Sequence, residues 1–283
     1  MRKVLAVSGG VDSMVMLFLM AQKYSQDELV VATFDHGTRE SSKADAEFVS
    51  QIASALQLKI YRGEARLGVK TSEEKAREKR YAFLRDVAEK EGGEIYTAHH
   101  LDDLVETVAI NLTRGTGMRG LAALNAPNVK RPFLDGTFGK VFDKCEILSV
   151  ASENEIVFRQ DPTNASDEYL RNRIRNKTID LPKKTKLKIF ELWQEQVKLI
   201  REIDKTVDGI IPEDLVFERE WFKKMGENEA LEILRAALAR ADVSAIRPQI
   251  REFLKAICSY QPGKKFNLPE DRLVKLSKKD FRL

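Results

Sequence analysis

Cysteine is scarce in this sequence. The 283 residues contain two cysteines, Cys145 and Cys258, which stand far apart and form no Cys-x-x-Cys pair. A disulfide framework, a cysteine-rich zinc site and an iron–sulfur cluster held by this chain alone all need more cysteines at closer spacing. The composition therefore argues against these three kinds of site.

Long apolar runs and a cleavable leader are missing as well. The longest apolar run, Met14 to Ala21, is far shorter than the roughly 20 residues that a membrane-spanning helix needs. The sequence starts Met1-Arg2-Lys3 and continues into a short strand pattern with no small-residue cleavage site. We expect a cytoplasmic protein with no membrane partner.

Charge of one sign is not in large excess, but it is unevenly distributed. The chain has 48 Lys and Arg against 44 Asp and Glu, a net charge of +4. The segment Arg171 to Lys188 has eight basic residues and one acid, a net +7, and the last 20 residues add +4, so the other 245 residues net −7. A basic run is typical of a solvated helix face, but the strength of this one favours contact with RNA phosphates.

Short strand patterns alternate with helical patterns through the first half of the chain. The strand patterns cover residues 4–7, 29–34, 58–61 and 94–98, and the helical patterns cover residues 12–23, 43–56, 72–91 and 102–113. This alternation predicts an α/β fold with a Rossmann-like parallel sheet that has helices on both faces. The carboxyl ends of its strands should then share one edge, where such folds bind ligands.

The alternation stops after about residue 130. Helices are predicted over residues 185–208, 228–240 and 248–258, with short strand-like pieces around Phe266 and Leu273. Ile211-Pro212-Glu213-Asp214 marks a boundary, and the chain length suits about two domains of roughly 150 residues. We predict a catalytic domain with a linker helix over residues 1–210 and a small, mainly helical accessory domain over residues 211–283.

The loop after the first strand pattern reads Ser8-Gly9-Gly10-Val11-Asp12-Ser13 and opens a helix. Its glycines allow positive φ and close backbone approach, and the free N–H groups at the positive helix end suit a phosphate. The Gly-Lys-Ser/Thr ending of a Walker A loop is absent. A plain strand–turn–helix connection uses the same residue types, but the complete six-residue loop directly after the first strand favours phosphate binding.

All three histidines of the chain follow predicted strands. His36 comes after the second strand, and His99 and His100 come after the fourth. In a parallel sheet these positions lie at the edge that carries the glycine-rich loop. The histidines are therefore expected to share a site with that loop and not to pack in the core.

Three carboxylates follow the histidine pair. Asp102, Asp103 and Glu106 enter the next predicted helix on similar faces. Acidic residues in a first turn are ordinary partners of the helix dipole. As a site, they would bind Mg²⁺ together with ATP, or an amine substrate, and a histidine–aspartate transition-metal centre is the rival.

A second glycine-rich segment, Arg114-Gly115-Thr116-Gly117-Met118-Arg119-Gly120, contains a formal Gly-x-Gly-x-x-Gly pattern. A dinucleotide site would place this pattern between a strand and a helix, whereas here it ends a helix. We interpret it as a helix stop with Arg114 and Arg119 facing anions.

Taken together, these segments resemble the motifs of a known enzyme family. The loop Ser8 to Ser13 resembles the signature of the N-type ATP pyrophosphatases, or PP-loop superfamily, which hold pyrophosphate while an acceptor atom is adenylated. The segments that follow are Glu74-Lys75-Ala76-Arg77-Glu78-Lys79-Arg80-Tyr81, His99-His100-Leu101-Asp102-Asp103-Leu104-Val105-Glu106-Thr107, Arg114-Gly115-Thr116-Gly117 and Arg171-Asn172-Arg173-Ile174-Arg175. In this order they closely resemble the tRNA(Ile)-lysidine synthetase family from about Lys3 to Lys177. Ala98, where the family often has Gly, and Leu104, where Gln is usual, are small departures that remove no charge.

The resemblance implies an enzyme that uses ATP and Mg²⁺ to ligate L-lysine to C2 of the wobble cytidine of tRNA(Ile) with the anticodon CAU. ATP would adenylate the cytosine at C2 with release of pyrophosphate, and the lysine ε-amine would then displace AMP. The partners are then this tRNA and L-lysine, and a homodimer is compatible with the sequence.

The resemblance also implies roles for individual residues. Ser8, Gly9, Gly10, Val11, Asp12 and Ser13, with Asp35 at the end of the neighbouring strand, would bind ATP and its pyrophosphate. Asp103 would hold Mg²⁺, Arg114 would steady the adenylate, Asp102 and Glu106 would hold the lysine ammonium, and His99 or His100 would transfer a proton. Arg171, Arg173, Arg175 and Lys177 would contact the RNA, together with the accessory domain.

Three other functions remain open at the level of sequence. A tRNA 2-thiolation enzyme of the same superfamily would be expected to carry cysteine pairs, which are absent here. An amide-forming synthetase acting on a small acid would not need the basic run 171–188. A non-catalytic RNA-binding protein would bind ATP and tRNA but release no pyrophosphate.

Overall fold

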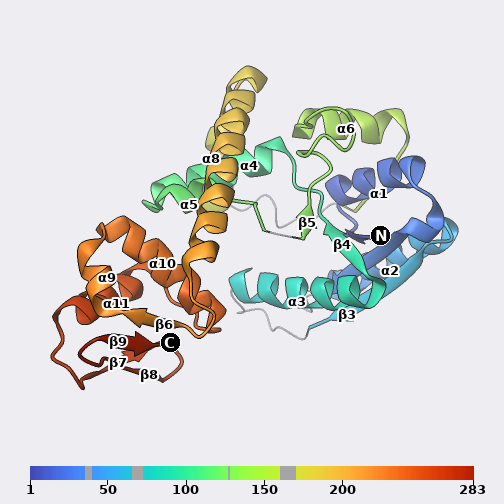
Figure 1. Ribbon diagram of the computed structural model, residues 1–283. Helices are drawn as coiled ribbons and strands as arrows, with labels where there is room; N and C mark the ends of the chain where they lie inside the picture. Colours follow the sequence, from blue (N-terminus) through green and yellow to red (C-terminus); the bar gives the residue numbers. More distant parts are fainter. Residues whose placement is uncertain (36–39, 66–72, 127, 160–169) are drawn as a thin grey trace. The chain divides into compact units, whose positions relative to one another are not determined.

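The computed structural model describes residues 1–35, 40–65, 73–126, 128–159 and 170–283 (Figure 1). Backbone contacts divide the chain into two compact units, residues 1–196 and 197–283. The division falls within one long helix, α8 (Lys183–Ile210). The domain boundary predicted at residue 210 coincides with the end of this helix and stays a prediction. His36 lies outside the described residues.

The first unit is built on a parallel sheet of five strands in the order β3-β2-β1-β4-β5. The strands are β1 (Arg2–Ala6), β2 (Leu29–Asp35), β3 (Lys59–Glu64), β4 (Gly93–Tyr96) and β5 (Val129–Lys130). Every pairing between them is parallel, which confirms the predicted α/β fold. The short strand β5 was not predicted, because two residues carry no periodicity. The strand order reverses between β1 and β4, the kind of position where open α/β sheets bind ligands.

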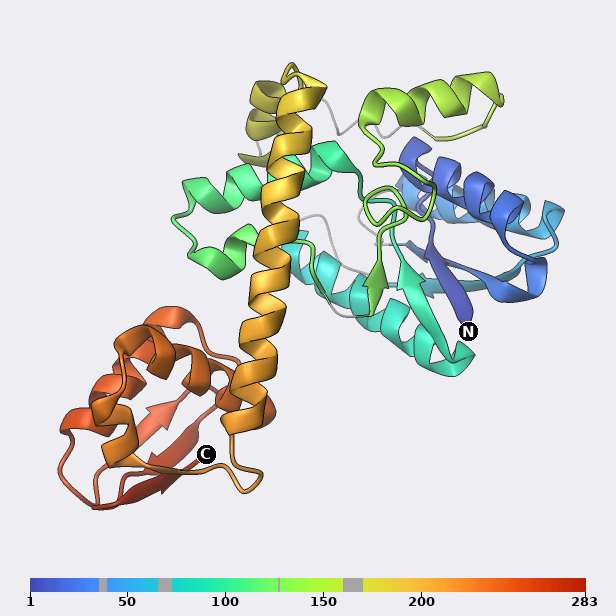
Figure 2. The same ribbon diagram turned by 45° about the horizontal axis from the view of Figure 1, so that its top comes forward.

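Helices cover both faces of this sheet. α1 (Val11–Lys23), α2 (Glu40–Ala55) and α6 (Lys144–Glu153) pack on one face, and α3 (Glu73–Glu91) packs on the other (Figure 2). Strand residues alternate between the two cores: Leu5 and Val31 face the first group, and Val4 and Val30 face α3. This alternation follows from the period of two in a strand. The loops that follow the strands lie at the carboxyl edge of the sheet.

The rest of the first unit is helical. α4 (Leu101–Thr113), α5 (Met118–Leu121), α7 (Leu170–Thr178) and the start of α8 follow or flank the sheet, and a 3-10 turn, η1 (Gln26–Glu28), precedes β2. Leu101, Leu104, Leu134 and Phe190 form their buried core. Because α4 and α7 pack together, the basic segment that follows residue 170 lies against the helix that carries the predicted carboxylates.

The second unit contains helices and two small sheets. Its elements after α8 are β6 (Val216–Glu218), α9 (Arg219–Lys224), α10 (Glu227–Arg240), α11 (Arg247–Ser259), β7 (Lys265–Leu268), β8 (Arg272–Lys275) and β9 (Asp280–Arg282). The two sheets are the antiparallel pairs β6-β9 and β7-β8. Phe217, Phe222, Phe253 and Phe281 centre its core. This confirms the mainly helical C-terminal region, whereas β6, α9 and β9 were missed. None of the helices in the described part of the chain is long and apolar enough to cross a membrane.

Candidate active site at the carboxyl edge of the sheet

The glycine-rich loop connects β1 to α1. Gly9 has a φ of +87°, a conformation that L side chains rarely adopt. The Ser13 hydroxyl donates to the Gly10 carbonyl at 2.9 Å and accepts from the Ser8 N–H at 3.1 Å, which fixes the turn. Gly10 is the N-cap residue of α1, and no side chain caps the helix. The first N–H groups of α1 are therefore directed at the loop with no side-chain cap, as an anion site requires.

Asp12 faces a lysine that the sequence did not single out. Lys144 Nζ lies 2.6 Å from Asp12 Oδ1, and both side chains are about one-third exposed. Lys144 is the first residue of α6, which follows the capping residue Asp143. No motif marks Lys144, and the two residues are 132 positions apart. Only the tertiary fold brings this cation to the loop.

The first two α4 carboxylates are both held by other elements. Asp102 Oδ1 accepts from Lys186 Nζ at 2.6 Å, and Asp102 Oδ2 accepts from the Lys144 backbone N–H at 2.8 Å. Burial raises the pKa of Asp102, but the nearby His100 ring, the Lys186 ammonium and the Lys144 backbone N–H outweigh it and hold that pKa well below its usual range. Asp103 accepts from the His100 backbone N–H at 3.1 Å and lies 3.6 Å from Arg171.

Glu106 is the most buried of the three carboxylates, with 3% of the residue exposed. Arg175 Nε donates to it at 2.7 Å and Arg171 Nε at 3.3 Å. The hydrogen bond that Arg175 donates to Glu106 raises the pKa of Arg175. Two of the four arginine and lysine residues predicted to contact RNA are thus directed at Glu106, while Arg173 and Lys177 are exposed on α7.

The two adjacent histidines are in opposite electrostatic surroundings. His100 is buried, with Nε2 3.5 Å from Asp103 and 3.7 Å from Asp12. Burial lowers its pKa, but the carboxylates of Asp103, Asp102 and Asp12 outweigh burial and raise the pKa above its ordinary value. His99 shares a hydrogen bond of 2.9 Å with Thr97, and burial and nearby arginines lower its pKa to about 3. His99 is therefore uncharged at neutral pH, whereas the surroundings of His100 favour its protonated form.

The remaining predicted residues lie at different distances from this group. Asp35 ends β2, the neighbour of β1, and so lies at the same edge as the loop. Arg114 is the C-cap residue of α4 and is exposed. An α-helix rises about 1.5 Å per residue. The 13 residues of α4 therefore place Arg114 at the opposite end of the helix from Asp102. The structure therefore brings together the loop, the histidines and the carboxylates, but not Arg114.

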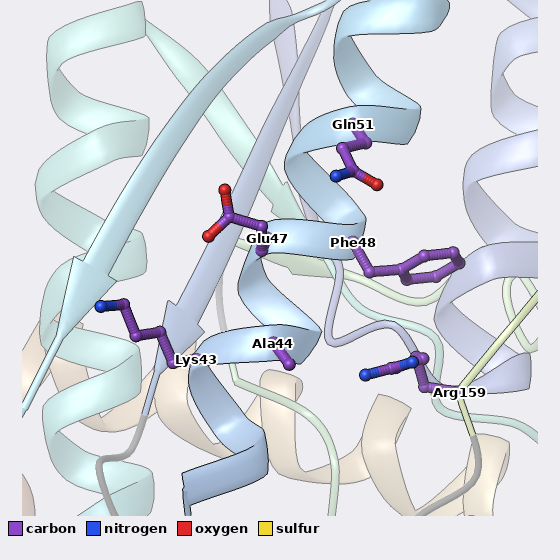
Figure 3. A pocket seen from close by; sticks show the side chains of 6 residues that line it. All are labelled: Lys43, Ala44, Glu47, Phe48, Gln51 and Arg159. Atoms are coloured by element: carbon purple, nitrogen blue, oxygen red, sulfur yellow. The ribbon is translucent and has the colours of Figure 1, made fainter.

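A pocket that sequence reasoning missed lies beside the loop (Figure 3). It has a volume of about 450 Å³ and is lined by Lys43, Ala44, Glu47, Phe48, Gln51 and Arg159. The Arg159 backbone N–H donates to the Gly9 carbonyl at 2.9 Å, and Arg159 Nε lies 3.2 Å from Asp45. In Figure 3, Phe48 and Arg159 lie on one side of α2 and Lys43 and Glu47 on the other. These residues form no sequence motif.

Comparisons with known proteins identify the family of this chain. Residues 1–181 match the model of the PP-loop domain family. A tRNA(Ile)-lysidine synthase of Thermosipho africanus is 37% identical over 243 residues, which cover 81% of this chain and 55% of that protein. One from Enterococcus faecalis is 39% identical over 188 residues, 64% of this chain and 40% of that protein. The chain spans about half the length of the curated relatives it matches.

Among solved structures, the chain resembles the U34-tRNA thiolase NcsA from Methanococcus maripaludis, which has a 4Fe-4S cluster. The TM-score is 0.58 at 18% sequence identity, with 70% of this chain and 72% of that one covered. At this level of identity the likeness shows a common fold.

Proposed function

This chain belongs to the PP-loop family, and from that membership we propose that it is a tRNA(Ile)-lysidine synthase. It would ligate L-lysine to C2 of the wobble cytidine of tRNA(Ile) with the anticodon CAU, at the expense of ATP. The observation that carries the proposal is the group of three α4 carboxylates beside the phosphate loop, each within 4 Å of a lysine or arginine side chain. A site that holds ammonium and guanidinium groups is suited to an amine substrate. The lysine, the RNA and the cytidine come from the names of the relatives.

ATP is expected to bind through the loop. Backbone N–H groups of Gly9, Gly10 and Val11 and the hydroxyls of Ser8 and Ser13 would hold the pyrophosphate, because they lie at the positive end of α1. Asp12 would help to hold the metal ion, and Asp35 would contact the nucleotide from the neighbouring strand. Both the loop and Asp35 lie at the carboxyl edge of the sheet, where the adenylation would take place.

Magnesium ion is the metal that these residues fit. Mg²⁺ prefers hard oxygen ligands and usually keeps several waters while bridging phosphates. Asp12 and Asp103 offer such oxygens, and in the described part of the chain no group of three or more His, Cys, Asp or Glu residues is arranged to hold a metal by itself. One or two carboxylates together with ATP phosphates satisfy Mg²⁺. The metal would neutralise the negative charge that develops on the phosphates.

Lysine binding is assigned to Asp102 and Glu106. In the absence of substrate these carboxylates hold Lys186 and Arg175, and the substrate ammonium would exchange for such a contact. The attacking amine must lose a proton, and His99 is our candidate acceptor because it is unprotonated at neutral pH, although a pKa of about 3 makes it a weak base. The carboxylates of Asp103, Asp102 and Asp12 would favour the protonated form of His100. Arg114 is assigned to the adenylate phosphate. It would contact this phosphate only after a movement of α4 or of the bound RNA.

RNA contacts are assigned to the exposed face of α7 and to the C-terminal region. Arg173 and Lys177 are exposed there, whereas Arg171 and Arg175 would first have to leave Glu106. The region 211–283 would hold the body of the tRNA through its basic last residues.

The test is the complete reaction. The chain is incubated with ATP, Mg²⁺, radiolabelled lysine and a tRNA(Ile) transcript with the anticodon CAU, with initiator tRNA as the control. Label in tRNA(Ile) alone supports the proposal. Pyrophosphate release without lysine transfer points to another acceptor, and no release points to a non-catalytic RNA-binding protein.

A further inference from the structure

The phosphate loop has no cation of its own. From Ser8 to the end of α1 the sequence has no arginine and a single lysine, Lys23, which lies in the last turn of the helix and donates to the Thr137 carbonyl. Phosphate loops that end in Gly-Lys-Ser/Thr carry a lysine that reaches the β- and γ-phosphates of the nucleotide. In this fold, a lysine with that task would have to come from another element.

Lys144 of α6 is placed to supply it. Its ammonium donates to Asp12 Oδ1 at 2.6 Å, and Asp12 lies in the first turn of α1, at the end of the loop. The Lys144 backbone N–H donates to Asp102 Oδ2 at 2.8 Å. The main chain of Lys144 is therefore fixed to α4, while its side chain extends to the helix end where the phosphates are expected.

The place of Lys144 in its own helix is unfavourable for a cation. Lys144 is the first residue of α6, and the dipole of a helix disfavours positive charge at its N-terminus. An ion pair between partly exposed side chains contributes little to stability, and both side chains of the Lys144–Asp12 pair are about one-third exposed. The pair alone is a weak reason for a lysine at this position, whereas an anionic ligand is a stronger one.

The Lys144 ammonium is also free to change its partner. The exposed fraction of its side chain is 38%, compared with 10% for Lys186, which is held at Asp102. Lysine carries its charge and three donors on a flexible four-carbon stem. Asp12 is one of the carboxylates proposed to hold Mg²⁺, so the metal would take the acceptor that Lys144 now uses. A phosphate oxygen of the same nucleotide would replace that acceptor.

We propose that Lys144 is the phosphate-binding cation of this site and donates to a non-bridging oxygen of the pyrophosphate part of ATP. This inference rests on the proposed function, whose first step releases that pyrophosphate. As the acceptor atom of the base bonds to the α-phosphorus, the bond from this phosphorus to the bridging oxygen breaks, and its electron pair leaves with pyrophosphate. Lys144 stabilises the added negative charge and keeps its proton.

A second role for Lys144 would be to neutralise Asp12, because an unpaired carboxylate beside the loop repels phosphate. The two roles differ in the variant Asp12→Asn, which has no carboxylate to neutralise. A lysine that acts only on Asp12 becomes dispensable for phosphate binding in this variant. A lysine that contacts the phosphate does not.

The main test measures the affinity of the chain for inorganic pyrophosphate by calorimetry in a buffer without Mg²⁺. Lys144→Met should weaken binding about tenfold, and Lys144→Arg, which keeps the charge, should retain part of the affinity. Lys140→Met is the matched control, because Lys140 is exposed just before α6 and pairs with Glu146, which keeps its contact with Lys183 at 2.8 Å. It should bind pyrophosphate like the wild type. Equal affinities of Lys144→Met and Lys140→Met overturn the inference.

A double-mutant cycle with Asp12→Asn separates the two roles. Lys144→Met should still weaken pyrophosphate binding about tenfold in the Asp12→Asn background. No further loss in that background overturns the inference and leaves Lys144 as a partner of Asp12. Thermal unfolding of each variant checks that the fold is kept.

These measurements contain neither tRNA nor lysine, so they do not depend on the ligation. A chain that binds pyrophosphate through Lys144 but transfers no lysine to tRNA(Ile) would refute the proposed function alone. A wild-type chain that binds neither ATP nor pyrophosphate would refute both.

Discussion

Lys186 Nζ lies 2.6 Å from Asp102 Oδ1, with only 10% and 15% of the two side chains exposed. Lys186 also donates to the Ile179 carbonyl, and Asp102 also accepts from the Lys144 backbone. This one ion pair therefore connects α4, which carries the carboxylates, to the start of α8 and, through Lys144, to α6. It fixes the orientation of a residue proposed to bind the lysine ammonium.

Replacing Lys186 should destabilise the first unit. Lys186→Met leaves Asp102 buried without its cation, and we expect the free energy of unfolding to fall by about 3 kcal/mol. Lys188→Met removes an exposed lysine from the same helix and should change it by less than about 0.5 kcal/mol. Urea unfolding followed by circular dichroism measures both, and equal stability of the two variants would contradict a structural role for the pair.

The Lys186–Asp102 pair should also make the stability of the protein depend on pH in the acid range. Because the folded pKa of Asp102 is lowered, its contribution to stability is present above the unfolded pKa of about 3.9 and is lost as the pH falls below it. Lys186→Met should therefore lose less stability than the wild type between pH 5 and pH 3 (about two pH units around that pKa). An identical acid profile for the two proteins would show that Asp102 is not held by Lys186.

Gly9 should be required for ATP binding beyond its effect on stability. An alanine at φ +87° is strained by about 1–2 kcal/mol, and the loop must change shape to relieve it. We expect Gly9→Ala to weaken ATP binding at least tenfold in calorimetry. Gly139→Ala, at φ +80° with open space around it, is the matched control. It should lose similar stability and keep its ATP affinity; parallel losses of affinity would remove the loop from the nucleotide site.

The two adjacent histidines should titrate far apart. We expect NMR of the imidazole nitrogens to show His99 uncharged at about pH 5 and His100 titrating above the ordinary histidine pKa of about 6.5. The stability that depends on His99 is present above the unfolded pKa of about 6.5 and falls as the pH drops towards 3. The stability that depends on His100 is present below the unfolded pKa of about 6.5 and is lost as the pH rises through the folded pKa of His100. His99→Gln and His100→Gln assign the signals, and two titrations together near 6.5 would contradict the assignment.

Replacing Glu106 should change the KM for lysine more than the KM for ATP. Glu106→Gln keeps the shape and removes the charge, so the KM for lysine should rise about tenfold while the KM for ATP changes little. Glu91→Gln is the control, because Glu91 is equally buried but pairs with Lys59 and Arg2 on another part of the sheet. It should reduce stability and leave both KM values unchanged. A lysine KM that Glu106→Gln does not alter would remove Glu106 from the lysine site.

Local patterns predicted most of the fold. Alternating apolar runs and helical periodicity located β1 to β4 and α1 to α4, because each element buries a face defined by its own sequence. They missed β5, which has only two residues, and α6, whose 10 residues follow an irregular stretch. These elements depend on the sheet that they join, and a single sequence carries little signal for that dependence.

The sequence predicted the phosphate loop, the histidines and the carboxylates of the candidate site, but not the lysine and arginine residues that pair with these carboxylates. The phosphate loop, the histidines and the α4 carboxylates lie in compact motifs at strand ends, so topology alone brought them together. Lys144 meets Asp12 across 132 positions, and Arg175 meets Glu106 across 69. The sequence showed α7 as a basic run available to RNA, since the pairing that neutralises it exists only in the folded chain.

Mass spectrometry of the nucleosides shows whether lysine is attached to the wobble cytidine. tRNA(Ile) with the anticodon CAU is incubated with the chain, ATP, Mg²⁺ and lysine, then digested completely. The wobble cytidine should be replaced by a nucleoside heavier by one lysine less one water, only when ATP and lysine are both present. An unmodified cytidine beside hydrolysed ATP, or a sulfur-containing product when a sulfur donor is supplied, would contradict it.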